Sequence, residues 1–196
     1  MPNEESRRPH TGRRRNEEAR RAILDAAVEL IGRDEGPVTI DTIAAAAGVG
    51  KQTIYRWWPS KGAVLLEAMA ERATADVPVT DTGSLAGDLD AFLLATFRSA
   101  GTGRTAPLLR MVMAEAQRDE QVAEVMRDFI AKRRAALRGV LERAGGRGEI
   151  RADADLDLMV DQAFGVLWYR ILIGHAPLGE NEARELGRSL VIQSRP

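Results

Sequence analysis

The stretch from Thr39 to Lys61, which reads TIDTIAAAAGVGKQTIYRWWPSK, constrains the fold of this chain more than any other. Its first part carries apolar residues at the i, i+3, i+4 and i+7 positions of one helical face, namely Ile40, Ile43, Ala44 and Ala47. Thr39 directly precedes them as an N-cap acceptor, and Gly48 can take the left-handed conformation that ends a helix. The pattern therefore predicts a short helix that stops in a glycine turn, with Val49 as an apolar plug.

A second short helix is predicted from about Gly50 to Trp58. Ile54 and Trp58 lie four residues apart and set its buried face. Its other residues point outward or to the flanks, namely Lys51, Gln52, Tyr55 and Arg56. Pro59 ends the helix, and Ser60 can cap the next one. Two short helices around a glycine turn, the second with polar groups on its free face, are the helix-turn-helix layout that fits the major groove of DNA.

The residues AAAAGVGKQTIYRWWPSK resemble the DNA-binding segment of the TetR-type transcriptional repressors. Members of that family carry a glycine turn, a short recognition helix ending in aromatics, and a Pro-Ser-Lys or similar start of the fourth helix. The resemblance is specific from Arg20 to about Met69, and beyond this range only length and helical pattern agree. Two departures weaken helix starts: Gly50 stands where serine is common, and Gly62 and Ala63 stand where an acid would strengthen a cap.

Composition favours an all-α fold. The chain has 196 residues and is 44% hydrophobic, which is enough to fill a core, and Ala, Leu, Arg and Glu dominate. We expect a disordered basic arm over 1–15, a three-helix helix-turn-helix DNA-binding domain over 16–75, and a larger helical regulatory and dimerisation domain over 76–196. Cysteine is absent and no apolar run approaches a membrane span, so a cytoplasmic protein without a membrane partner is expected.

Hydrophobic periodicity and breaker residues predict the remaining helices. A first helix runs from about Asn16 to Arg33 and a fourth from Ser60 to about Thr74. After a loop over 76–83, the predicted helices cover 85–99, 105–117, 120–144, 155–175 and 180–192. Gly145, Gly146 and Gly148 are expected to form the turn between the third and fourth of these five.

The helix predicted over 155–175 is apolar around much of its circumference, which means that it is covered on more than one side. A partner subunit is the simplest second cover, and the central helix of a monomeric bundle is the alternative. In the resembling family, the last two helices of each subunit form a four-helix interface with their copies. The resemblance therefore implies a homodimer, whose two recognition helices, about 34–36 Å apart, read a palindromic operator in double-stranded DNA.

Candidate DNA contacts divide into two groups, because phosphate contacts set register while base-edge contacts give specificity. The resemblance implies contacts with the DNA phosphate backbone for Thr39, Tyr55, Trp57 and Lys61. The recognition helix brings a second group within reach of base edges, namely Lys51, Gln52, Thr53 and Arg56. Trp57 can equally be a packing residue, and a solvated charge is the alternative interpretation of Arg56. Trp58 is expected in the core. The arginines of the N-terminal arm, at 7, 8 and 13–15, form either phosphate contacts or a solvated tail.

The resemblance also implies that a small-molecule effector enters the second domain, shifts the fourth helix and lowers DNA affinity. Met and aromatic residues can line an adaptable pocket there, although for any one of them an ordinary core position is the better interpretation: Phe92, Phe97, Met111, Met113, Met126, Phe129, Phe164 and Trp168. Polar groups that can orient a ligand are Arg110, Gln117, Gln162 and Tyr169.

We expect no enzyme, cofactor or metal site, because His10 and His175 lie in no metal-ligand spacing and beside no nucleophile motif. The sequence thus favours a repressor released from its operator by an effector. An activator, a repressor without a natural inducer, and a helical interaction protein that has lost DNA binding remain as alternatives.

Overall fold

The computed structural model describes residues 10–33, 36–76 and 81–195. In these ranges the α-helix is the only regular secondary structure, so the all-α prediction is confirmed. Their bounds are α1 His10–Gly32, α2 Ile40–Ala47, α3 Lys51–Tyr55, α4 Lys61–Asp76, α5 Leu85–Gly101, α6 Thr105–Ala116, α7 Glu120–Gly146, α8 Leu156–Ile173 and α9 Glu180–Ser194.

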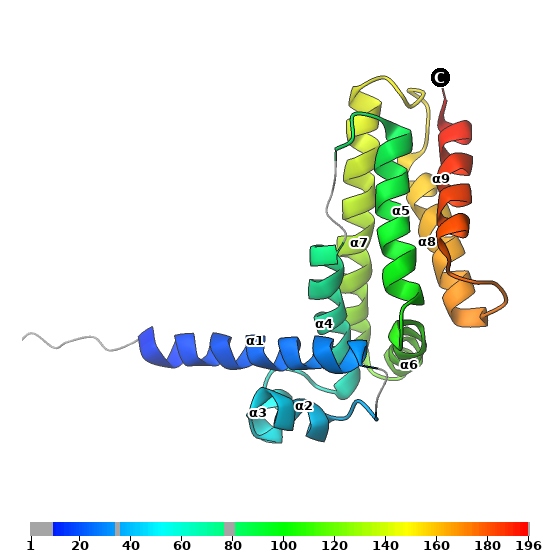
Figure 1. Ribbon diagram of the computed structural model, residues 1–196. Coiled ribbons are helices and arrows are strands. Elements are labelled where there is room, and N and C mark those ends of the chain that lie inside the picture. The colour runs from blue at the N-terminus through cyan, green and yellow to red at the C-terminus, as the bar shows by residue number, and fades with distance from the viewer. Residues whose placement is uncertain (1–9, 34–35, 77–80, 196) are drawn as a thin grey trace, which may run out of the picture.

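The helices form a small N-terminal domain, α1–α4, and an upright C-terminal bundle, α5–α9 (Figure 1). In the view of Figure 1, α1 lies across the base of the bundle, with α2 and α3 beneath it. Helix α4 contacts α1 on one side and α5, α6 and α7 on the other. It therefore belongs to the core of both domains and is the main physical link between them.

The turn between α2 and α3 has the predicted geometry. Thr39 accepts a hydrogen bond from the backbone N–H of Thr42 at 3.1 Å, while the Thr42 hydroxyl accepts from the backbone N–H of Thr39 at 2.9 Å. Gly48 ends α2 in the left-handed region with φ 66, and Val49 packs partly buried against the core. The capping and glycine-turn predictions are confirmed.

Several helix boundaries differ from the sequence-based predictions, among them those of α1, α3 and α7. Helix α1 begins at His10 rather than near Asn16, so the prediction of disorder over 1–15 is wrong for 10–15, which are helical. Residues 1–9, with Arg7 and Arg8, lie outside the described residues. Helix α3 ends at Tyr55, although Trp58 still donates its backbone N–H to Ile54 at 3.0 Å. Helix α7 continues through Gly146, because the left-handed turn is made by Gly148 alone, with φ 76.

A buried carboxylate holds the end of the bundle farthest from α2 and α3. Asp88, at the start of α5, accepts hydrogen bonds from the backbone N–H of Thr82 at 2.6 Å, the Thr82 hydroxyl at 2.7 Å and Arg147 at 3.0 Å. Burial raises the pKa of Asp88, but these hydrogen bonds outweigh it, so the pKa lies below its ordinary value of 3.8. The ionised carboxylate thus ties the start of α5 to the residue that caps α7.

Candidate nucleic-acid interface and internal cavity

Helix α3 presents a polar face to solvent. Lys51, Gln52, Tyr55 and Arg56 are exposed, and Thr53 is half-buried. Four of these five side chains surround one shallow hollow, namely Gln52, Thr53, Tyr55 and Arg56. The opposite face packs into the core, since Ile54 is 0% and Trp58 2% exposed. The predicted division of this helix into an inner and an outer face is confirmed.

Both cations of this face have polar partners within the N-terminal domain. Lys51 Nζ lies 2.5 Å from Asp41 Oδ1, and hydrogen bonding to this carboxylate raises the pKa of Lys51. Arg56 donates to Asn16 Oδ1 of α1 at 2.9 Å. These contacts are exposed to solvent, where such interactions are weak, so either cation can exchange its partner for a nucleic-acid group at low cost.

The remaining predicted interface residues lie beside α3. The Thr39 hydroxyl accepts the hydrogen bond that caps α2, and Lys61 is half-buried in the first turn of α4. The Trp57 ring packs against the core, and its indole Nε1 is buried without a hydrogen-bond partner among the described residues. The packing interpretation of Trp57 is therefore favoured, because its N–H reaches a phosphate only if the ring moves.

Glu67 of α4 links the recognition segment, residues 39–61, to the rest of the domain. Its carboxylate accepts the indole N–H of Trp58 and pairs with the guanidinium of Arg20 in α1. The Arg20 guanidinium carbon also lies 5.9 Å from the centre of a Trp58 ring. Sequence reasoning missed this link, although an acid within the apolar run of α4 was a usable signal.

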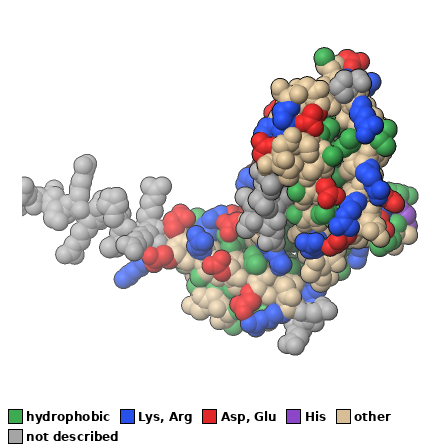
Figure 2. All heavy atoms as spheres, turned by 45° about the horizontal axis from the view of Figure 1, so that its top comes forward, with side chains coloured by type: hydrophobic (Ala, Val, Ile, Leu, Met, Phe, Trp, Pro, Cys, Tyr) green, Lys and Arg blue, Asp and Glu red, His purple; other side chains and the backbone are tan. Residues whose placement is uncertain are grey.

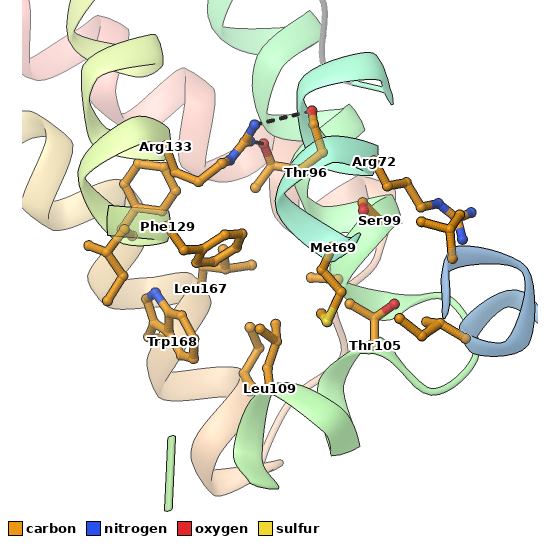
Figure 3. A pocket seen from close by; sticks show the side chains of 17 residues that line it. Met69, Arg72, Thr96, Ser99, Thr105, Leu109, Phe129, Arg133, Leu167 and Trp168 are labelled. Carbon is orange, nitrogen blue, oxygen red and sulfur yellow. Dashed lines mark hydrogen bonds between the residues drawn. The ribbon is translucent and has the colours of Figure 1, made fainter. Parts of the chain in front are cut away.

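A narrow cavity of about 60 Å³ lies where the two domains meet (Figure 3). Helices α1 and α4 of the N-terminal domain form one part of its wall, and α5–α8 form the rest. The lining residues are Val28, Ile31, Met69, Arg72, Ala73, Thr96, Ser99, Ala100, Thr105, Leu109, Phe129, Ile130, Arg133, Phe164, Leu167, Trp168 and Ile171. Its wall is thus mainly apolar, with a few hydroxyls and two guanidinium groups.

The cavity includes only part of the predicted pocket. Phe129, Phe164 and Trp168 line it. The other five candidates do not, namely Phe92, Phe97, Met111, Met113 and Met126. Phe92 and Phe97 are 2% and 1% exposed and fill the core between helices, which a single sequence cannot distinguish from a pocket wall.

None of the four predicted polar residues lines the cavity either. Arg110 donates to the backbone carbonyl of Ile171 at 2.8 Å, and Tyr169 is 59% exposed beside His175. The amide oxygen of Gln162 is buried without a hydrogen-bond partner in the described chain, and Gln117 is exposed. Arg72, Thr96, Ser99, Thr105 and Arg133 supply the polar groups instead, and the sequence pattern did not single them out.

Large apolar side chains reach solvent on the last two helices. Those of α8 are Leu158, Tyr169, Leu172 and Ile173, between 43% and 62% exposed, and Ile192 of α9 is 65% exposed. Figure 2 shows hydrophobic side chains at the surface of the C-terminal bundle, with charged side chains of both signs over both domains. The described residues contain no helix that is both long and apolar enough to span a bilayer, and no His, Cys, Asp or Glu cluster suited to a metal.

Comparison with known families covers both domains. Residues 23–68 match the family described as bacterial regulatory proteins, tetR family. Residues 79–190 match the tetracyclin repressor-like C-terminal domain. Both are families of transcriptional regulators, and the first includes the entire turn between α2 and α3.

Individual proteins resemble the chain over most of its length. An uncharacterized HTH-type transcriptional regulator, YdeS of Bacillus subtilis, is 36% identical over 179 residues, which cover 89% of each chain. The DNA-binding transcriptional repressor TetR of Mycobacteroides abscessus is 31% identical over 163 residues, or 82% of this chain and 85% of its own. The crystal structure of the regulator SCO0332 superimposes with a TM-score of 0.80 at 32% identity, covering 91% of this chain and 100% of that one.

Proposed function

Because the chain belongs to the TetR family of transcriptional regulators, we propose that it is a homodimeric repressor that a small-molecule effector releases from a palindromic operator. The observation that carries this proposal is the position of the cavity. Its wall combines α1 and α4, which support the recognition helix, with four helices of the C-terminal bundle. A molecule that enters it acts on both domains at once.

The outer face of α3 is proposed to read the major groove. Gln52 is exposed and can pair with adenine, while Lys51 and Arg56 can pair with guanine once they leave their present partners. Thr53 lies beside them at the hollow. The backbone contacts are assigned to Thr39, Tyr55 and Lys61, and to Trp57 only if its ring turns outward. A cytoplasmic location is part of this proposal, because the matched family is one of bacterial regulatory proteins that act on DNA.

The exposed apolar side chains of α8 and α9 are proposed to form the homodimer interface. Burying side chains of this size removes a large apolar area from water. A two-fold axis through this surface joins the copies by the bundles and leaves both recognition helices free. In the proposed dimer, the two recognition helices bind the two half-sites of one palindrome.

The cavity supports release by expansion. Ligand pockets usually enclose about 300–1,000 Å³, far more than the 60 Å³ present between these helices. An effector must therefore push the walls apart. Since α4 packs on α1 and holds Trp58 through Glu67, displacing α4 moves the recognition helix. The effector binds the expanded state better and so shifts the population away from the DNA-binding state.

Selection of binding sites from random DNA duplexes with the purified protein tests this function. We expect a palindrome whose half-sites lie about one helical turn apart. Binding is then measured on the selected site and on altered versions of it. Lys61→Ala should weaken binding to all of these sequences alike and reduce the salt dependence, whereas Gln52→Ala should change which sequence is preferred. If a folded dimer enriches no sequence, the proposal is wrong and an interaction protein is the better interpretation. Equal losses on every sequence for both variants contradict the division of contacts.

A further inference from the structure

One side chain in the cavity wall is unusual. Arg133 of α7 lines the edge of the cavity, and its guanidinium donates to the Thr96 hydroxyl at 2.8 Å and to the backbone carbonyl of Ala73 at 3.3 Å (Figure 3). The guanidinium carbon also lies 5.1 Å from the ring centre of Phe92. Both hydrogen-bond acceptors are neutral, so the positive charge is not balanced by either of them.

Arg133 pairs with no carboxylate among the described residues. Other arginines of α7 and its C-terminal cap do pair with acids, namely Arg127, Arg134, Arg138 and Arg147. Burial lowers the pKa of Arg133, and burial is the one cause of this shift. Arginine nevertheless stays protonated in proteins. A half-buried cation without a counter-ion is therefore held beside an internal space, where an anion is attracted more strongly than in water.

The remaining wall defines the other end of a ligand. Phe129, Leu167 and Trp168 face the same space as Met69 and Leu109 (Figure 3). These groups favour an apolar body. We propose that the effector is a small carboxylate with an apolar body, and that Arg133 binds its carboxylate. This inference rests on the proposed function in treating the cavity as the effector site.

The cavity also limits the size of the first probe. A dry apolar cavity of about 150 Å³ binds benzene, and the present space is smaller. A one-ring compound therefore already forces the walls apart. Benzoate, benzamide and benzylamine share this ring and differ mainly in charge, so they separate recognition of the anion from burial of the ring.

The experiment measures dissociation constants of the three probes with the full-length protein. The readouts are the intrinsic tryptophan fluorescence, to which Trp168 in the cavity wall contributes, and the shift in Tm. Benzoate should bind the wild type roughly 10- to 100-fold more tightly than benzamide, as expected for a hydrogen bond between charged groups. Arg133→Met and Arg133→Gln should remove this preference. Arg127→Gln changes an exposed arginine of the same helix and should leave it intact.

The proposal is overturned if benzamide binds as tightly as benzoate, if both Arg133 variants keep the preference, or if benzoate gives no shift at millimolar concentration. The comparison of benzoate with benzamide uses only the wild type, so it holds even if a variant does not fold. A mobility shift on the selected operator separates the two proposals. If the protein binds the operator and only neutral compounds release it, the proposed function stands and the proposed carboxylate effector is refuted. If benzoate binds but the protein does not bind the operator, the carboxylate site stands and the proposed function is refuted.

Discussion

Replacing Glu67 by alanine tests whether one carboxylate holds the recognition segment in place. Trp58 is 2% exposed, and its indole N–H loses a charged acceptor in this variant, which costs about 1.5–3 kcal/mol. The pair with Arg20 is partly exposed, at 30% for each side chain, and contributes about 0.2–1 kcal/mol. Glu67→Ala should therefore lower the free energy of unfolding by about 2–4 kcal/mol, a large part of the total stability of about 5–15 kcal/mol.

Urea denaturation at one fixed protein concentration measures this change, because the stability of a dimer depends on concentration. Glu71→Ala is the matched control: Glu71 lies 3.9 Å from Arg20, is 49% exposed and should change stability by less than about 0.5 kcal/mol. A double-mutant cycle with Trp58→Phe isolates the indole contact, which we expect to be coupled by at least about 1 kcal/mol. A cycle without coupling, or equal losses at Glu67 and Glu71, refutes the reasoning.

Three further predictions follow from single positions. Gly48→Ala should destabilise by about 1–2 kcal/mol because φ is +66°. Gly139→Ala, inside α7, should stabilise by about 0.5–1 kcal/mol, because the added Cβ meets no heavy atom within 4 Å beyond the neighbouring backbone of its own helix. Urea midpoints that shift in the same direction contradict this pair. Asp88→Asn should lower the free energy of unfolding at neutral pH. Because the pKa of Asp88 is lowered, its ionised carboxylate contributes to the free energy of unfolding above pH 3.8, and this contribution is lost as the pH falls through the folded-state pKa. The difference in stability between the wild type and Asp88→Asn should therefore disappear in acid. A difference that does not change with pH is the contrary result. Ile173→Glu should shift sedimentation toward a monomer, and Gln121→Glu, a new charge at the start of α7, should not.

The recognition segment was predictable almost residue by residue, because its determinants are local. Thr39 caps the residues directly after it, and Gly48 adopts a conformation that other residues avoid. The spacing of Ile54 and Trp58 alone defines the inner face of α3. Local hydrogen bonds and side-chain periodicity act within a few residues, so a single sequence carries them. The helix boundaries were less predictable, since α1 and α7 extend through polar and glycine residues that tolerate a helix as well as a turn.

The cavity was not predictable in the same way. Met and aromatic residues occur in cores and pocket walls alike, and only packing decides which of them face an empty space. Phe92 and Phe129 have the same chemistry, yet Phe92 is buried in the core and Phe129 lines the cavity. Arg133 carries no sequence signal at all, because its lack of an acidic partner depends on which helices surround it.

The sequence by itself thus determined the helical fold class, the glycine turn and the outer face of the recognition helix, since each depends on neighbours along the chain. The tertiary structure alone decided that Glu67 binds both Trp58 and Arg20, and that a cavity lies between α1, α4 and the bundle. These features bring together residues far apart in sequence, and their existence depends on packing angles that no local pattern encodes.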